Sequence, residues 1–253
     1  MTVGEWLLLL VAGFGAGVIG STAGLASLVS YPALLLIGLP PVTANVTNTV
    51  GLIGSSIGSV AGSRRELSGL GPLIVRRVPV AVVGGATGAA LLLLSPPGSF
   101  AQIVPYLVAT ASVLLLLSPL IRRISVSRRR EGPVRTDGGA GVVAGILVCC
   151  VYGGYFGAAA GVMLLGLLLA GTDRSLPVAN AVKNLLLGAA NATAAVAFAL
   201  TGEVAWVAVP PLLIGCVIGG RLGPAIVRRV PPTVMRWVIG VAGLGLAARL
   251  WLG

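Results

Sequence analysis

Charged and titratable residues are scarce in this sequence. Only 9% of its 253 residues are charged and none is histidine, whereas a soluble domain carries about 25% charged residues. The six acids lie at the ends of apolar segments or in loops, at Glu5, Glu66, Glu131, Asp137, Asp173 and Glu203. The sequence therefore offers no Ser-His pair, buried acid pair or metal cluster, and we expect neither an enzyme nor a metal or cofactor site.

Aromatic residues are also few, at 5%, although the net charge is +11. Proteins that bind single-stranded nucleic acid combine basic side chains with aromatic ones on which the bases stack. Here the arginines form short clusters between apolar runs, which is typical of the positive-inside rule of membrane proteins. The three cysteines, Cys149, Cys150 and Cys216, lie inside apolar runs and are interpreted as small buried hydrophobes. We expect a lipid bilayer as partner and no nucleic acid.

Long apolar runs are abundant, and hydrophobic residues make up 57% of the chain. Because the runs are continuous, they predict an all-α polytopic membrane protein and not a barrel of alternating strands. A helix needs about 20 residues to cross the hydrocarbon core, and segments 24–39 and 158–171 are short for that. We expect ten segments, at 5–20, 24–39, 42–63, 71–95, 101–121, 138–156, 158–171, 176–200, 204–224 and 232–252.

The positive charges predict the orientation. If the segments cross alternately, one side receives fifteen arginines and the other only Arg249. Cytoplasmic loops carry the excess of Lys and Arg, so we expect a multi-pass protein of the cell inner membrane with both ends of this sequence outside. The result is the same if the first two segments of each half form a re-entrant hairpin, and the sequence leaves that choice open.

The polar stretch 122–137 divides the chain into two halves. It is rich in arginine and contains Gly132-Pro133, so we expect a cytoplasmic basic linker between a first membrane repeat at 1–121 and a second at 138–253. Residues 44–49 (Ala-Asn-Val-Thr-Asn-Thr) match residues 179–184 (Ala-Asn-Ala-Val-Lys-Asn), 135 positions later. Five segments per half place the second copy upside down, and inverted repeats with interrupted helices are typical of secondary transporters. The alternative is that glycine-rich membrane helices look alike because small residues serve helix packing.

Each half carries one polar stripe on an otherwise apolar helix, given about 100° of rotation per residue. Carboxamides and hydroxyls cannot face lipid without cost, so we expect both stripes to face the partner half or a wet cavity near the midplane. The stripe residues predicted to bind substrate are Asn45, Asn48 and Thr49 in the first half and Asn180, Lys183, Asn184 and Asn191 in the second.

Lys183 is the only lysine in the chain and lies inside an apolar segment. An ionisable residue within a membrane segment indicates a functional site by default. The alternative is that its long side chain snorkels to the cytoplasmic surface. The asparagines around Lys183 favour the functional interpretation, because a snorkelling lysine needs no polar neighbours.

The glycine-rich breaks before the two short segments predict helices that start inside the membrane. Such a helix end points free N–H groups and a positive dipole end at whatever lies there. We expect the breaks at Gly20 and Gly24 in the first half and at Gly157 and Gly161 in the second, with extra donors from the side chains of Ser21, Thr22 and Tyr155. With Lys183, these groups suit a small oxyanion, although the short segments can also be read as ordinary short helices.

These motifs resemble the sulfite exporter TauE/SafE family of membrane permeases, over nearly the whole chain. The resemblance is strongest at residues 152–165 (Tyr-Gly-Gly-Tyr-Phe-Gly-Ala-Ala-Ala-Gly-Val-Met-Leu-Leu), 179–184 and 202–206 (Gly-Glu-Val-Ala-Trp). The first break departs from the family's usual glycine run, reading Gly-Ser-Thr-Ala-Gly at 20–24, and the second has alanines where more glycine is common. The resemblance implies a two-repeat transporter for sulfite, an organosulfonate or a related anion.

We therefore expect a secondary transporter that exports a small sulfur-containing anion. Moving a negative charge out of an inside-negative cell is downhill by about 2.3 kcal/mol per charge per 100 mV, so export needs no coupled sodium ion. The alternatives are a cation-coupled importer or channel for an anion such as sulfate or a carboxylate, and a membrane scaffold without substrate. The sequence is compatible with a homo-oligomer and leaves the number of copies open.

Overall fold

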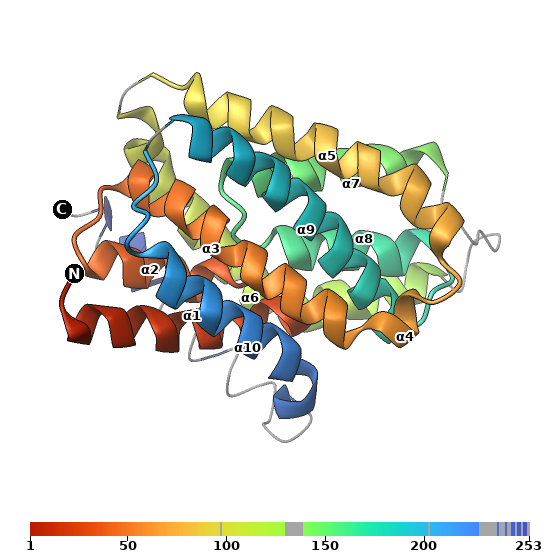
Figure 1. Ribbon diagram of the computed structural model, residues 1–253. Coiled ribbons are helices and arrows are strands. Elements are labelled where there is room, and N and C mark those ends of the chain that lie inside the picture. The colour runs from red at the N-terminus through yellow and green to blue at the C-terminus, as the bar shows by residue number, and fades with distance from the viewer. Residues whose placement is uncertain are drawn as a thin grey trace.

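The computed structural model of the chain describes residues 1–96, 98–129, 139–201 and 203–227, together with a few single residues between 237 and 251. The secondary structure of these residues is entirely helical (Figure 1). The helices are α1 (Val3–Ala23), α2 (Ser27–Leu36), α3 (Pro41–Gly62), α4 (Arg64–Leu67), α5 (Gly71–Leu93), α6 (Ser99–Arg129), α7 (Ala140–Tyr155), α8 (Ala160–Gly171), α9 (Leu176–Thr201) and α10 (Val209–Val227).

Three of the described helices are long and apolar enough to cross a membrane, namely Val3–Ala23, Gly71–Leu93 and Leu176–Leu200. The polytopic, all-helical membrane fold predicted from the sequence is thereby confirmed. The first nine expected segments correspond to α1–α3 and α5–α10, and the tenth, 232–252, falls largely outside the described residues.

Two boundaries differ from the expected ones. α6 continues to Arg129, so the first part of the expected linker at 122–137 is helical, while residues 130–138 lie outside the described part of the chain. Loss of apolar character marks where a helix leaves the bilayer, and arginine and serine let it continue as a helix beyond that point. α10 begins at Val209 instead of 204, and Pro210 and Pro211 occupy its first turn, where the missing N–H has no partner within the helix.

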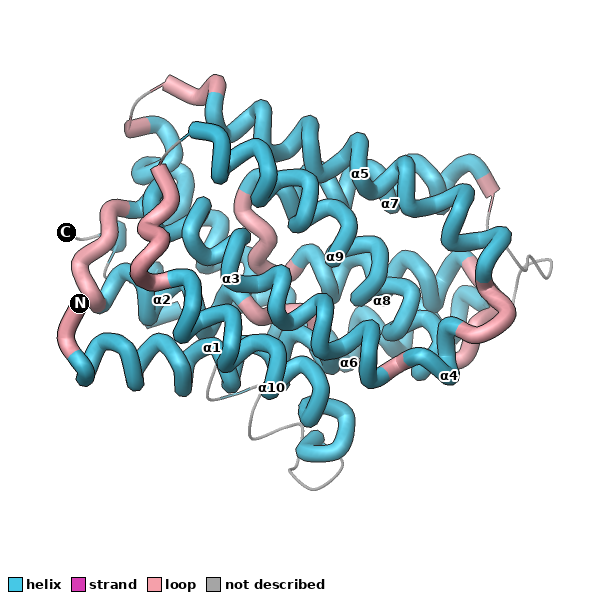
Figure 2. Tube along the Cα trace, in the orientation of Figure 1, coloured by secondary structure: helices cyan, strands magenta, loops and turns pink. Residues whose placement is uncertain are grey.

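Both short segments follow a break in the helical backbone. α1 ends at Ala23 and is capped by Gly24, which has φ 78° and donates its N–H to the carbonyls of Ile19 and Gly20. The break after α7 contains Gly157 with φ 80° and Ala159 with φ 65°. α2 then packs along α1, and α8 along α7, so each pair forms a helical hairpin. Short loop segments accordingly lie within the bundle as well as at its two ends (Figure 2).

The two breaks touch each other. A Cβ atom added to Gly24 would lie 2.5 Å from the Cα atom of Gly161, so only glycine permits this approach of the two backbones. α3 starts at the end of the molecule where the chain's N-terminus lies and finishes beside α4 at the other end (Figure 1). The first hairpin therefore begins and ends at the same side of the molecule, as both alternatives for the first two segments require.

The helices pack as two bundles that exchange members between the sequence halves. α10, from the second half, packs along α1 and α3, whereas α5, from the first half, packs along α7 and α9. Glycines allow both contacts: a Cβ atom on Gly17 would lie 2.5 Å from the carbonyl oxygen of Cys216, and one on Gly84 would lie 2.6 Å from the Cβ of Cys150. One of the two buried apolar clusters consists entirely of residues from α5, α7, α8 and α9.

Candidate functional site

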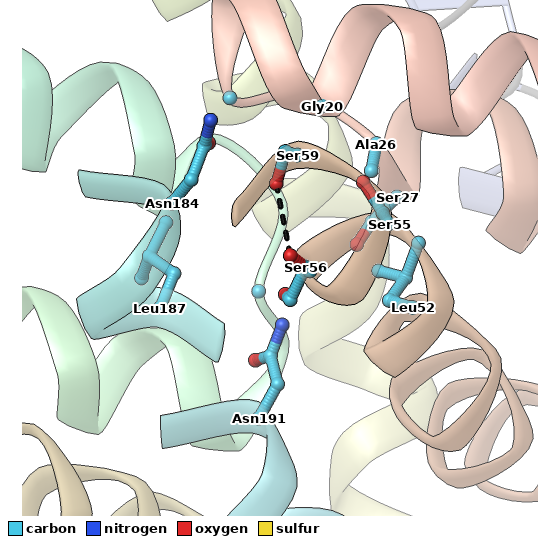
Figure 3. A pocket seen from close by; sticks show the side chains of 12 residues that line it. Gly20, Ala26, Ser27, Leu52, Ser55, Ser56, Ser59, Asn184, Leu187 and Asn191 are labelled. Carbon is cyan, nitrogen blue, oxygen red and sulfur yellow. Dashed lines mark hydrogen bonds between the residues drawn. The ribbon is translucent and has the colours of Figure 1, made fainter. Parts of the chain in front are cut away.

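A cavity lies beside the crossing of α3 and α9, next to the first helix break. Its volume is about 50 Å³, which is room for a few water molecules at about 10–15 Å³ each. α9 contributes Asn184 and Asn191 from one side, and α3 contributes Ser55, Ser56 and Ser59 from the other (Figure 3). The remaining lining residues are Gly20, Gly24, Ala26, Ser27, Leu52, Gly157 and Leu187.

The cavity forms here because the two long helices approach closely just beside it. A Cβ atom on Gly188 would lie 2.9 Å from the Cβ of Ser56, so α3 and α9 nearly touch at this level. Asn184, Leu187 and Asn191 share one face of α9, three and four residues apart. The break after α1 supplies the third wall through Gly20 and Gly24.

The carbonyl end of α1 receives three side chains from α9. The amide nitrogens of Asn180 and Asn184 donate to the carbonyl oxygen of Ser21 at 2.8 and 3.0 Å. The ammonium group of Lys183 donates to the carbonyl oxygen of Gly20 at 3.1 Å. Lys183 is fully buried, so its side chain points into the protein, and the snorkelling alternative is wrong.

The carbonyl end of α7 receives a side chain from α3 in return. The amide nitrogen of Asn45 donates to the carbonyl oxygen of Tyr155 at 2.9 Å. Asn45 and Asn180 occupy matching places in the repeated motif, so each reaches the break of the opposite half. Among the described residues, the Oδ1 atoms of both asparagines are buried without a hydrogen-bond partner.

Asn48 and Thr49 lie on the same helix but bond elsewhere. The amide of Asn48 donates to the hydroxyl of Ser27 at 3.1 Å, and its Oδ1 atom accepts from the hydroxyl of Ser30 at 2.5 Å. Thr49 donates its hydroxyl to the carbonyl of Asn45 in its own helix. Asn48 therefore holds α2 against α3, whereas the hydroxyl of Thr49 bonds only within α3.

The side chains of Ser21, Thr22 and Tyr155 do not line the cavity in this structure. Ser21 and Thr22 both donate their hydroxyl groups to the carbonyl of Val18, at 3.0 and 2.8 Å. A serine or threonine late in a helix commonly bonds back to the preceding turn. Tyr155 packs its ring against Phe100, with a centroid distance of 5.8 Å. At the positions of Ser21 and Tyr155, the main-chain carbonyl makes the contact between the halves.

Sequence reasoning missed Ser27, Ser55 and Ser59 as lining residues. Ser59 lies three residues beyond Ser56, and Asn45, Thr49, Leu52, Ser56 and Ser59 follow the 3.6-residue period of one helix face. Extending the polar stripe further along α3 would therefore have predicted Ser59 as a lining residue. Ser27 carries no such signal, because its place in the wall depends on how α2 turns back after the break.

The electrostatics of the cavity favour an anion. Ala26 and Ser27, at the amino end of α2, lie in its wall, and this helix end has no side-chain cap. The amino end of a helix carries a partial positive charge, and at α2 the N–H groups of Leu28, Val29 and Ser30 bond the carbonyls of Leu25 and Ala26. Among the described lining residues none is acidic, and hydroxyl and carboxamide groups add further donors.

Broken helices that meet in the interior of an all-helical membrane protein, around a small polar cavity, are the construction of a membrane transporter. The chain belongs to the sulfite exporter TauE/SafE family, whose sequence model matches residues 9–250. The family resemblance seen in the sequence motifs is thereby confirmed, as is the expectation that the protein is not an enzyme.

Curated relatives carry transporter names as well. "Probable membrane transporter protein YfcA" of Escherichia coli (strain K12) is 29% identical over 239 residues, which cover 93% of this chain and 85% of the relative. "Probable membrane transporter protein" of Haemophilus influenzae is 24% identical over 247 residues, covering 96% and 93%. "Probable membrane transporter protein ORF9" of a Sinorhizobium species is 26% identical over 247 residues, covering 96% and 90%. No solved structure matches the chain.

Proposed function

We propose that this membrane transporter exports a small sulfur-containing anion, such as sulfite or an organosulfonate, through the cavity between α3 and α9. The observation that carries the proposal is the lining of that cavity. Serine hydroxyls and the carboxamides of Asn184 and Asn191 surround it beside the amino end of α2. Hydroxyl and carboxamide groups donate hydrogen bonds to an oxyanion without requiring a metal, and the hydroxyl of Ser59 would leave the carbonyl of Ser56 to do so.

The inverted repeat is part of the same proposal, and two reciprocal arrangements support it. α1 packs with α10 as α7 packs with α5, so each half lends a helix to the other. Asn45 donates to the break after α7 as Asn180 donates to the break after α1. In transporters with inverted repeats, the substrate site lies where the two repeats meet, which is the position of this cavity.

The distribution of arginines supports an orientation with both ends of this sequence outside the cell inner membrane. Arg64 and Arg65 lie in α4, which contacts α9 near its start, and Arg77 and Arg174 line one small cavity at that end. An end of the molecule rich in arginine faces the cytoplasm under the positive-inside rule. We assign the stretch 122–137 to this side, including the basic end of α6.

Flux measurements with the purified protein in liposomes test the substrate and the direction. We expect sulfite or an alkanesulfonate to leave vesicles whose interior is held negative, and the flux to grow with the potential, because export moves negative charge down the field. Acetate and sulfate serve as comparison anions. A flux that ignores the potential but follows a sodium gradient would contradict export and indicate a cation-coupled importer.

Two variants of α9 test the cavity as the binding site. Asn191→Ala removes a donor from the lining and is expected to raise the KM for the anion about 10-fold or more, since a hydrogen bond to a charged group contributes about 1.5–3 kcal/mol. Thr193→Ala is the control, because the Thr193 hydroxyl bonds the carbonyl of Ala189 in its own helix. Equal KM values for the two variants would place the anion elsewhere.

Cysteine labelling tests the orientation. Glu131→Cys places a thiol in the stretch assigned to the cytoplasm, and the native cysteines are buried. We expect a membrane-impermeant maleimide to label this variant only after the membrane has been opened. Labelling in intact cells would contradict the assigned orientation.

A further inference from the structure

We propose that the ammonium group of Lys183 is a built-in cation for the carbonyl end of α1, so that the transporter needs no sodium ion at this helix break. In other transporters with broken helices, unwound carbonyls and the carboxyl ends of half-helices coordinate the coupling ion. The part of the inference that concerns transport rests on the proposed function, whereas the part that concerns the cation at the helix end does not.

The contact of Lys183 places a positive charge at a helix carboxyl end. Its Nζ atom donates to the carbonyl oxygen of Gly20 at 3.1 Å, and the side chain is fully buried. Gly20 lies in the last turn of α1, which ends at Ala23. The carboxyl end of a helix carries about half a negative charge, and this end lies in the protein interior. Within α1, all of which is described, the last turn has no basic residue of its own.

Neutral donors also bond two carbonyls of this helix end, those of Gly20 and Ser21. The carbonyl of Gly20 also accepts from the N–H of Gly24 at 3.1 Å. The carbonyl of Ser21 accepts from both Asn180 and Asn184. What Lys183 adds beyond a further hydrogen bond to Gly20 is charge, which an amide donor does not supply to the helix dipole.

The second break shows that the charge is not a packing requirement of the repeated motif. The residue that matches Lys183, 135 positions earlier, is Asn48, and it bonds Ser27 and Ser30 instead of a break. The carbonyl of Tyr155, at the end of α7, receives the neutral amide of Asn45. The last turn of α7, fully within the described residues, contains no basic residue. The break after α1 thus receives a charged donor, Lys183, from a motif position that holds the neutral Asn48 in the other half.

The position of Lys183 relative to the cavity gives the charge a role in transport. Gly20, whose carbonyl it binds, and its neighbour Asn184 both line the cavity, but Lys183 itself does not. It is therefore a positioning residue that acts through the α1 carbonyl end. Its charge neutralises the negative helix end next to the cavity, so that an anion can bind there. Without Lys183, a sodium ion bound to the same carbonyls would have to supply this charge.

The inference is tested by removing the Lys183 side chain and supplying small cations from solution. The purified Lys183→Ala variant in detergent is titrated with methylammonium chloride, sodium chloride or choline chloride at constant ionic strength, and its Tm is recorded. We expect a Tm several degrees below that of the native protein, a rise with methylammonium or sodium, and no rise with choline, which is too large for the vacated space. The native protein is expected to show no difference among the three salts.

Transport measurements separate charge from hydrogen bonding. Lys183→Gln keeps an N–H donor for the Gly20 carbonyl but removes the charge, so we expect its anion flux to fall at least 10-fold, as in Lys183→Ala. Lys183→Arg is expected to retain most of the flux. Added sodium or methylammonium should restore anion flux in Lys183→Ala. The matched control, Asn184→Ala, should gain no flux from either cation.

Several results would overturn the inference. Native flux and Tm in Lys183→Gln would assign the lysine to hydrogen bonding alone, and a Tm of Lys183→Ala that responds equally to all three salts would exclude a cation site at the α1 end. The Tm titration needs no substrate. A native protein that moves none of the tested sulfur anions, combined with a cation-specific Tm rise in Lys183→Ala, would therefore refute the proposed function and leave the built-in cation intact.

Discussion

The two helix breaks have similar backbone turns but are stabilised by different side chains. The break after α1 is held by polar groups of α9, namely the amides of Asn180 and Asn184 and the ammonium of Lys183. Among the described residues, the break after α7 receives a single side-chain amide, from Asn45, and it is otherwise packed among aromatic rings. Phe156 lies edge-on to Tyr31 of α2 at 5.4 Å and against Phe100 of α6 at 5.9 Å.

This difference teaches which break belongs to the site and which to the scaffold. Aromatic packing buries much apolar area and fixes geometry, but it offers nothing to a polar substrate. The polar break supplies Gly20 and Gly24 to the cavity wall, and the aromatic break supplies only Gly157. Variants that weaken one break should therefore affect stability and anion binding in different proportions.

The largest expected effect comes from the aromatic break. Phe156→Ala removes a ring that is 1% exposed, and such a change costs about 3–5 kcal/mol of stability. We expect a large fall in Tm with a KM for the anion that changes less than about twofold among molecules that remain folded. Phe156→Leu, which keeps much of the volume, is the control. A KM that rises along with the loss of stability would mean that the two breaks do not divide these roles.

The contact between the breaks should respond asymmetrically to an added methyl group. Gly24→Ala creates a clash with Gly161 and also forces alanine into the left-handed region, at φ 78°, which together cost about 2–5 kcal/mol. Gly161→Ala creates the clash alone and should cost about 1–3 kcal/mol. Gly38→Ala is the control for backbone strain, because Gly38 has φ 87° and nothing within 4 Å of an added Cβ. Equal Tm values for Gly24→Ala and Gly38→Ala would show that the breaks separate easily.

The reciprocal asparagines should differ because their acceptors differ. The carbonyl of Tyr155 loses its side-chain donor in Asn45→Ala, and an unsatisfied buried acceptor costs about 1–3 kcal/mol. The carbonyl of Ser21 keeps Asn184 in Asn180→Ala, so we expect a smaller fall in Tm. The double variant Asn180→Ala with Asn184→Ala removes both side-chain donors to the Ser21 carbonyl. Its Tm should fall by more than the sum of the two single changes. Additive Tm changes would contradict a shared acceptor.

The smallest effect is expected at Thr22. Its hydroxyl bonds the carbonyl of Val18 in its own helix, so Thr22→Val should change stability by less than about 0.5 kcal/mol and leave the KM unchanged. The sequence suggested that this hydroxyl reaches the substrate. A several-fold rise in KM would restore that interpretation and show that Thr22 changes rotamer when an anion binds.

Much of the candidate site could be predicted because its signals are local. The glycine breaks, the two polar stripes and the unusual buried lysine follow from the sequence and the helical period. Two of the residues predicted to bind substrate, Asn184 and Asn191, line the cavity, as do three of the predicted break glycines, Gly20, Gly24 and Gly157. Lys183 and Asn180 bond the break beside it. The donors expected from Ser21, Thr22 and Tyr155 could not be judged in advance, because rotamer and neighbouring helix decide whether a hydroxyl faces outward or bonds the preceding turn.

The sequence by itself determined that this chain is a helical membrane protein of the TauE/SafE family, where its helices break, and which face of each stripe is polar. Composition and a period of 3.6 residues depend only on neighbours along the chain. The tertiary structure decided that α5 and α10 pack with the opposite half, that Gly24 meets Gly161, and that Lys183 reaches the carbonyl of Gly20. These pairings join residues far apart in the sequence, such as Gly84 and Cys150 at 66 positions and Gly20 and Lys183 at 163. They depend on which backbones can approach closely enough, which only the packed bundle fixes.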